Sequence, residues 1–166
     1  MTGTQHLSLG FTMGITAACM TYDSPAIVAG FTAVCTVASI FPDIDVKNSK
    51  IAQKLKISSF ITRLFLKHRS ITHTPLFLGI TSWLIYIFSI KSFPLPDYFL
   101  KAWIMGYLIH LIQDTFTSGG IKWLFPLWLK PISLLKIKSK SILGYITSFV
   151  LYGIGVVLII TNVINL

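Results

Sequence analysis

Charged residues are scarce in this chain. They make up only 11% of its 166 residues, whereas hydrophobic residues make up 54%. Glutamate is absent, and the acidic residues are five aspartates. A typical soluble domain carries about 25% charged residues, which keep its surface in water. The lack of charge argues against an ordinary soluble domain and favours a protein embedded in a membrane.

Cysteine and N-terminal basic residues are also rare. The two cysteines, Cys19 and Cys35, lie in apolar stretches without the CxxC spacing of a zinc ribbon, so we expect buried hydrophobic residues there. The first basic residue other than His6 is Lys47, so the basic region of a cleaved signal peptide is missing. We therefore expect the N-terminal segment to be a structural part of the mature chain.

Five apolar stretches are present, and a helix needs about 20 apolar residues, with a range of ~17–25, to cross a bilayer. The last stretch is long enough. The first two are short, so they either span with polar ends at the interface or form a hairpin that dips partway. We predict an all-α, polytopic membrane helical bundle of about five spans, forming a single domain over residues 1–166. The stretches are Leu7–Tyr22, Ala26–Phe41, Thr74–Ile90, Ala102–Thr117 and Ile142–Ile164.

Basic residues are distributed unevenly between the connecting loops. Seven lie between the second and third stretches, five between the fourth and fifth, and only Lys91 and Lys101 remain for the other side. Cytoplasmic loops carry an excess of positive charge, which predicts an inner-membrane, multi-pass protein with a cytoplasmic N-terminus. Apolar and basic residues alternate over Ser49–Lys67, which predicts an amphipathic helix on anionic lipid. Trp123–Trp128 is typical of an aromatic interfacial loop.

The histidines and three of the aspartates gather at the predicted cytoplasmic ends of these stretches. Pro42 favours extended backbone before it, where residues two apart project the same way, so Asp43 and Asp45 could share one ion or bridge two. An ionisable side chain within a span should face a partner, water or a cation. We predict one metal site whose ligands are His6, Asp43, Asp45, His68, His73, His110 and Asp114.

Helical spacing supports this grouping. His110 and Asp114 are four residues apart and share one helix face, and Gly106, one turn earlier, leaves room for a close neighbour. Arg69 lies between two of the predicted ligands, and a guanidinium suits two-point contact with a phosphate or carboxylate of a substrate. Thr72 and Thr117 are candidates for orienting the ligands by hydrogen bonds.

Structural readings of the same residues remain open. Asp43 or Asp45 could cap a helix or pair with Lys47, and Ser70 or Thr72 could cap the third span. His110 and Asp114 could instead link helices or relay protons. The last of these readings would fit a proton or metal transporter, although five spans without repeats do not favour one.

Four blocks of residues occur in order along the chain. They are Gln5-His6-Leu7, Phe41 to Asp45, His68 to Thr74 and Gly106 to Thr117, the last continuing into Gly119-Gly120-Ile121 and Leu124-Phe125-Pro126. Together these blocks resemble the LexA-binding, inner-membrane-associated family of bacterial metal-dependent hydrolases, here called YdjM-like. The chain departs from the family pattern at Gln5, Val46, Ser70 and Thr74, and Val46 stands where the family often has another histidine.

The resemblance implies a membrane-bound metal-dependent hydrolase, acting on a phosphoester or lipid-like substrate such as an anionic phospholipid at the cytoplasmic face. Mixed His and Asp ligands suit a divalent metal, zinc first and manganese second, which lowers the pKa of its bound water. Arg69, Asp45 and Thr72 are the predicted catalytic residues. The alternative is a non-enzymatic protein whose net charge of +9 recruits a regulator such as LexA, without direct contact with nucleic acid.

Overall fold

The structure is a computed structural model that describes residues 1–45, 71–138 and 141–164. Over these residues it contains five α-helices and one short 3-10 helix, and no strand, so the all-α prediction is confirmed for this part of the chain. Each α-helix coincides with one predicted apolar stretch. The elements are α1 (Gly3–Thr21), α2 (Pro25–Ala38), η1 (Phe41–Asp45), α5 (Pro75–Lys91), α6 (Asp97–Thr115) and α7 (Ile142–Ile164).

Local signals explain where these helices begin. Proline occupies the first turn of α2 and of α5, where its missing N–H costs nothing. Thr74 is the N-cap of α5, and its hydroxyl accepts a hydrogen bond from the Phe77 N–H at 3.3 Å. The cap is therefore Thr74 rather than Ser70 or Thr72. At the start of α1, the side chain of Gln5 accepts a hydrogen bond from the Thr2 N–H at 2.9 Å.

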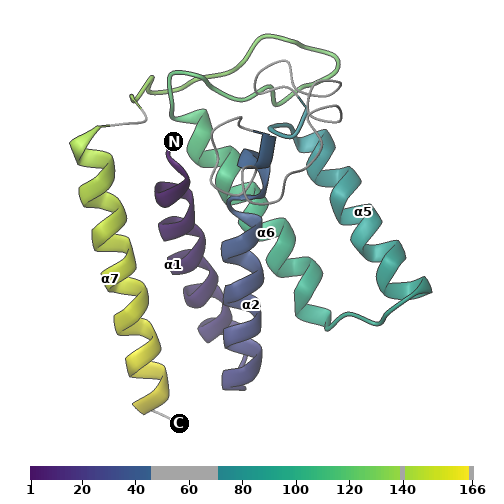
Figure 1. Cartoon of the computed structure of the whole chain (residues 1–166), viewed down its shortest axis with the longest axis vertical. Helices are drawn as coiled ribbons and strands as arrows, with labels where there is room; N and C mark the ends of the chain where they lie inside the picture. Colours follow the sequence, from purple (N-terminus) through teal and green to yellow (C-terminus); the bar gives the residue numbers. More distant parts are fainter. Residues whose placement is uncertain (46–70, 139–140, 165–166) are drawn as a thin grey trace.

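The centre of the bundle consists of α1, α2 and α6, which pack on one another (Figure 1). Helix α7 packs against α1 on one side, and α5 packs against α6 on the other. A Cβ on Gly106 of α6 would lie 2.1 Å from the carbonyl oxygen of Cys35, so only glycine allows these backbones to approach this closely. The prediction that Gly106 leaves room for a neighbour is confirmed.

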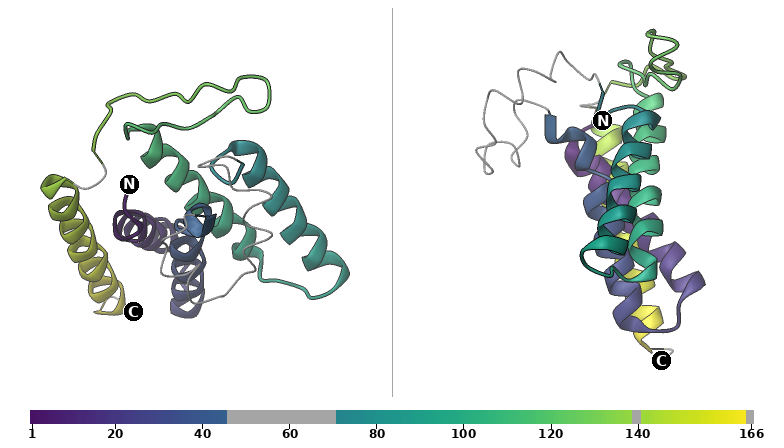
Figure 2. Two further views of the ribbon diagram at one scale, coloured as in Figure 1. Left: turned by 45° about the horizontal axis from the view of Figure 1, so that its top comes forward. Right: turned by 90° about the vertical axis from the view of Figure 1, so that its right-hand side faces the viewer.

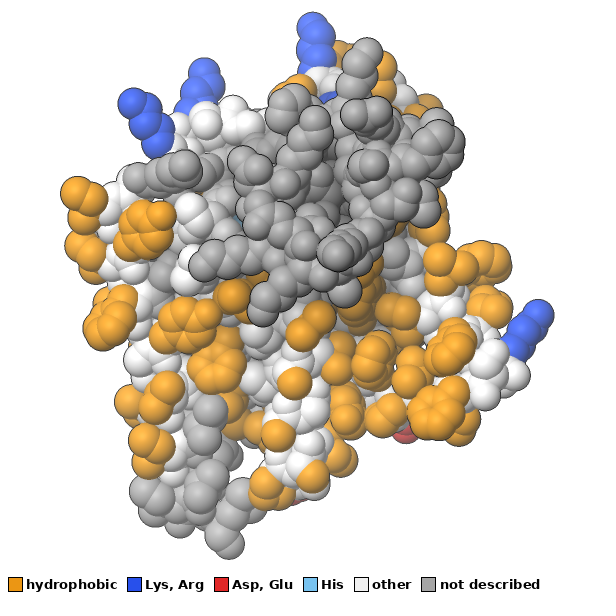
Figure 3. Space-filling model, viewed as in Figure 1, with side chains coloured by type: hydrophobic (Ala, Val, Ile, Leu, Met, Phe, Trp, Pro, Cys, Tyr) orange, Lys and Arg blue, Asp and Glu red, His pale blue; other side chains and the backbone are white. Residues whose placement is uncertain are grey.

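The surface of the bundle is apolar around its sides. Helix α5 has no fully buried residue, yet it exposes Trp83, Leu84 and Ile90 by more than half of their surface. Figure 3 shows hydrophobic side chains spread along the helices, with basic side chains near the ends. Exposed apolar surface on this scale is typical of a face that contacts a membrane or another protein.

Length and composition identify one described helix as a candidate membrane span. It covers Pro25–Asp43, 19 residues, and Pro75–Lys91 is apolar but shorter. The prediction of about five spans therefore stays a prediction. The amphipathic helix predicted over Ser49–Lys67 lies outside the described residues.

The segments that follow α2 and α6 in the sequence form one end of the bundle. Residues 116–138 run from α6 towards α7 without helix and fold back on themselves through bridges between Ile121 and Ile132 and between Thr117 and Ile137 (Figure 2). The backbone from Phe41 to Asp45 forms a 3-10 turn, so the extended conformation expected around Pro42 was wrong. Proline is tolerated here because it occupies the first turn of a helix, where no backbone donor is required.

Candidate metal centre

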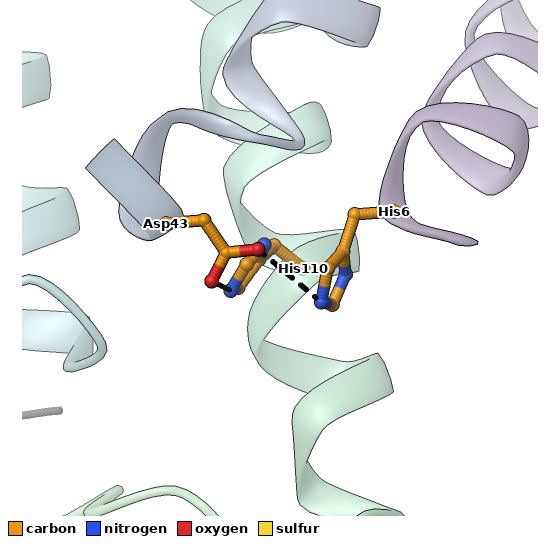
Figure 4. A group of neighbouring side chains, drawn as sticks. All are labelled: His6, Asp43 and His110. Atoms are coloured by element: carbon orange, nitrogen blue, oxygen red, sulfur yellow. Dashed lines mark ion pairs between the residues drawn. The ribbon is translucent and has the colours of Figure 1, made fainter. Parts of the chain in front are cut away.

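Five of the seven predicted metal ligands converge at this end of the bundle. His6 comes from the first turns of α1, Asp43 from η1, His73 from the residue pair before α5, and His110 and Asp114 from the last turns of α6. Figure 4 shows Asp43 lying against the rings of both His6 and His110. The side chain of Asp45 and all of His68 and Arg69 lie outside the described part of the chain.

Short distances join each of the three described histidines, His6, His73 and His110, to both carboxylates, Asp43 and Asp114. The Nε2 atom of His6 lies 3.4 Å from Asp114 Oδ1 and 3.9 Å from Asp43 Oδ2. The Nε2 atom of His73 lies 3.3 Å from Asp43 Oδ1 and 4.0 Å from Asp114 Oδ2. The Nε2 atom of His110 lies 3.8 Å from Asp114 Oδ2 and 4.0 Å from Asp43 Oδ1. All three imidazoles therefore turn the same nitrogen towards the acidic centre.

The cluster is buried. His6 and His110 have no exposed surface, Asp114 has 1%, His73 has 2%, and Asp43 alone reaches 20%. Burying two carboxylates costs several kcal/mol unless opposite charge compensates them. Asp43 is therefore the member of this cluster most open to solvent.

Hydrogen bonds to backbone and amide oxygens set the tautomers of two histidines. The Nδ1 of His110 lies 2.7 Å from the carbonyl oxygen of Ser39, which only accepts, so this nitrogen carries the hydrogen. The Nδ1 of His6 lies 2.7 Å from Oε1 of Gln113, whose amide nitrogen donates to the carbonyl oxygen of Gln5 at 3.2 Å. In both rings the neutral form therefore leaves the lone pair on Nε2.

These two Nε2 atoms are buried and have no hydrogen-bond partner among the described residues. A lone pair on each of them faces carboxylate oxygens, which also carry lone pairs. Such an arrangement repels unless a cation lies between the atoms. Metal-binding histidines in proteins typically donate their other ring N–H to a carbonyl or carboxylate, as His6 and His110 do here.

Neighbouring residues hold the third histidine. The hydroxyl of Thr72 lies 3.1 Å from Nδ1 of His73, and the hydroxyl of Tyr107 donates to the carbonyl oxygen of Thr72. The structure thus places Thr72 where it orients His73. Thr117 instead donates to the carbonyl oxygen of Asp114 at 2.8 Å, so it contacts the backbone at the end of α6 rather than the carboxylate.

The donor atoms fit a divalent ion. Ligand atoms about 2.0–2.2 Å from zinc lie roughly 3.3 Å apart in a tetrahedron, close to the shortest contacts here. The groups His6, Asp43 and His110, and His73, His110 and Asp114, each bring their donor atoms within 4.8 Å of one another and could hold a metal ion. The α-amino group of Met1 also forms an ion pair with Asp114 Oδ1, so one positively charged group already lies against this oxygen.

Sequence reasoning missed Gln113 and Ser39. Gln113 is buried in α6, next to Asp114 and three residues after His110. A polar side chain in that position was the available signal. Ser39 acts through its backbone carbonyl oxygen, which leaves no signal in the side-chain pattern.

Comparisons with known proteins identify the family of this chain. The sequence profile of the family described as YdjM inner membrane protein matches residues 1–164. The uncharacterized protein YvsG of Bacillus subtilis is 37% identical over 128 residues, covering 76% of this chain and 74% of YvsG. The inner membrane protein YdjM of Escherichia coli is 34% identical over 88 residues, covering 52% of this chain and 44% of YdjM.

The relative from Shigella flexneri, also described as inner membrane protein YdjM, matches to the same extent as the one from Escherichia coli. No solved structure gives a significant match. The family description supports an inner-membrane location. The chain belongs to the YdjM inner membrane protein family.

Proposed function

We propose that this protein is a membrane-bound, metal-dependent hydrolase that cleaves a phosphoester in an amphipathic substrate at the cytoplasmic membrane face. One observation carries the proposal. The buried Nε2 atoms of His6 and His110 have no hydrogen-bond partner among the described residues and face two carboxylates, while their Nδ1 hydrogens are already engaged.

A purely structural cluster would look different. If His6 and His110 only linked helices, an imidazolium Nε2–H would donate to a carboxylate, and a hydrogen bond of about 2.7–2.9 Å would form. The Nε2 atoms instead lie 3.4 Å or more from the carboxylate oxygens. This spacing leaves room for an ion between the donors, which supports metal binding over a proton relay.

The donor chemistry selects the class of metal. Imidazole nitrogens with carboxylate oxygens suit zinc first and manganese second. When bound, such an ion lowers the pKa of its water and polarises a phosphoryl oxygen. His6, Asp43, His73, His110 and Asp114 hold it, and the partly exposed Asp43 lies at the entrance. We assign the other predicted roles by sequence position: Asp45 and His68 complete the ligand set, and Arg69 binds the anionic substrate.

Charge at the two ends supports the proposed orientation. At the end of the bundle that holds the metal centre, the 116–138 segment carries four lysines and no acidic residue, whereas the opposite end carries two aspartates and two lysines, Asp23, Asp97, Lys91 and Lys101. The end with the excess of positive charge is the cytoplasmic end under the positive-inside rule. Multiple passes follow if α1, α5 and α6 cross the membrane beside α2 and α7.

Metal analysis of the full chain in detergent tests this function. We expect zinc or manganese in the purified protein, and release of phosphate or alcohol from bis-p-nitrophenyl phosphate or from anionic phospholipid vesicles. His110→Leu should remove most of the metal and lower turnover by at least 100-fold. Thr16→Val, a matched change on α1 away from the centre, should leave both unchanged. Wild-type protein that binds no divalent metal would contradict the proposal.

A second function is favoured by the net charge of +9, which suits recruitment of an acidic cytoplasmic partner or of a regulator such as LexA. Replacing the lysines over Lys47–Lys67 by glutamine should then abolish recruitment to membranes, measured by co-sedimentation with vesicles carrying the protein. Asp45→Ala should leave recruitment intact. Recruitment that survives the loss of these charges would argue against this second function.

A further inference from the structure

The relative orientation of the His6 and His110 rings makes it unfavourable for these two histidines to bind the same metal ion. Their rings are stacked, with centroids 3.8 Å apart and planes inclined by 21°. The lone pair of an imidazole nitrogen lies in the ring plane, so a metal ion bound by two histidines must lie near both planes. Planes so nearly parallel meet only roughly 10 Å away, whereas zinc lies about 3 Å from the ring centre.

His73 and His110 have the opposite relation. Their rings are inclined by 63°, with centroids 5.1 Å apart. Planes at this angle are compatible with convergence on one point, and the donor atoms of His73, His110 and Asp114 lie within 4.8 Å of one another, so both histidines can bind one ion. Distance alone would let His6, Asp43 and His110 share an ion. The ring planes instead pair His110 with His73 and give His6 a separate position.

Each carboxylate directs one oxygen towards each of these two positions. The oxygen of Asp43 nearest to His73 and His110 is Oδ1, at 3.3 and 4.0 Å, and the oxygen nearest to His6 is Oδ2, at 3.9 Å. Asp114 shows the same division, with Oδ2 nearest to His73 and His110 and Oδ1 nearest to His6. Figure 4 shows the two oxygens of Asp43 directed at different rings. A carboxylate with one oxygen on each side is arranged to bridge two ions.

We propose that the centre holds two divalent cations bridged by Asp43 and Asp114, one bound by His73 and His110 and the other by His6. This inference rests on the proposed function, because it assumes that the cluster is a metal centre. Two-metal hydrolytic sites hold their ions about 3.5–4 Å apart. Rings stacked with centroids 3.8 Å apart direct their Nε2 lone pairs along nearly parallel lines, which suits two neighbouring ions rather than one shared ion. Such a pair is suited to a phosphoester, since each ion contacts one of the reacting oxygens.

The two positions differ in the number of donors. Four donor atoms surround the position of His73 and His110, and three surround the position of His6. The amino group of Met1 also contacts Asp114 Oδ1 on the His6 side and competes there with a cation. The ion beside His6 is therefore the weaker and more readily exchanged of the two.

Manganese titration of metal-free, full-length protein in detergent tests the proposal with two readouts. We expect two Mn²⁺ per chain by elemental analysis, and an electron paramagnetic resonance spectrum with the exchange coupling of a bridged pair. His6→Leu should bind one Mn²⁺ and give an uncoupled spectrum. His73→Leu should weaken the tighter ion at least 10-fold, and Thr16→Val should behave as wild type.

The wild-type Mn²⁺ stoichiometry and exchange coupling distinguish the possible outcomes. A wild-type protein that binds a single Mn²⁺ without coupling overturns the bridged pair and leaves the proposed function standing. A wild-type protein that binds none overturns both. The wild-type stoichiometry and coupling decide the matter even if His6→Leu fails to fold, which circular dichroism and gel filtration would reveal.

Discussion

The hydrogen bond between His6 and Gln113 determines which nitrogen of His6 faces the metal centre. Gln113 cannot flip its amide freely, because its nitrogen donates to the carbonyl oxygen of Gln5. Its oxygen therefore accepts from Nδ1 of His6. Gln113, which is not itself a candidate ligand, thus sets the tautomer and ring orientation of the candidate metal ligand His6.

Gln113→Met should weaken metal binding by roughly 10–100-fold, the usual effect of removing a partner that orients a metal-binding histidine. The reason is that Nδ1 of His6 loses its acceptor, so the ring can rotate and change tautomer. Competition with a chromophoric chelator measures the change in affinity. Ile112→Met, at the neighbouring residue, which is 43% exposed, is the matched control and should leave affinity unchanged. Equal affinity in Gln113→Met and wild type would refute this role.

At the scale of the elements, the contact between α2 and α6 positions the two carboxylates. Asp43 follows α2 directly through η1, and Asp114 lies on α6, so the spacing of these two helices sets the distance between the acidic groups. The two helices approach closely at Gly106, where a Cβ would also lie 2.9 Å from the Cβ of Ala38. The close packing of α2 on α6 therefore sets the distance between the two carboxylates of the candidate metal centre.

Gly106→Ala should destabilise the protein by about 1–3 kcal/mol, the usual cost of overpacking, because a backbone carbonyl cannot move aside cheaply. It should also lower metal affinity by separating Asp43 from Asp114. Gly79→Ala on α5 is the matched control, since a Cβ there meets nothing within 4 Å. That change should be neutral or stabilise by up to about 1 kcal/mol. Thermal unfolding in detergent with and without metal measures both, and a Gly106→Ala protein as stable as Gly79→Ala would contradict this role of Gly106.

At the scale of the whole molecule, the two ends of the bundle differ in chemistry. The metal centre, the 116–138 segment and the start of α7 lie at one end, and the connections between α1 and α2 and between α5 and α6 lie at the other (Figure 1). Only the first end carries ionisable groups in a buried cluster among the described residues. Under the proposed function, this asymmetry restricts access of a substrate to one side of the membrane.

Thiol labelling of intact and lysed spheroplasts tests this orientation. In a chain whose Cys19 and Cys35 are replaced by alanine, Ser92→Cys should react with a membrane-impermeant maleimide before lysis, because it lies in the connection between α5 and α6. Leu127→Cys, at a side chain that is 92% exposed beside the metal centre, should react only after lysis. Labelling of both sites from the same side would contradict an arrangement in which α6 crosses the membrane.

The helices and much of the candidate site were predictable from local pattern. Apolar stretches bounded by proline, glycine and polar residues specify helices directly, because backbone hydrogen bonding within one segment needs no partner from elsewhere. The i, i+4 spacing of His110 and Asp114 likewise places them on one face of any helix. The close approach at Gly106 was predictable for the same reason, since only the absence of a Cβ permits it.

The sequence by itself therefore determined an all-helical, membrane-type chain and the set of residues able to bind metal. Tertiary structure alone decided which of them meet, because His6, Asp43 and Asp114 are brought together by the packing of α1, α2 and α6 across long separations in the chain. It also decided the 3-10 turn at Asp43, the hydrogen bond of His110 to the Ser39 carbonyl oxygen and the stacking of His6 on His110. Those features depend on the relative rotation of packed helices, which no periodicity within a single segment encodes.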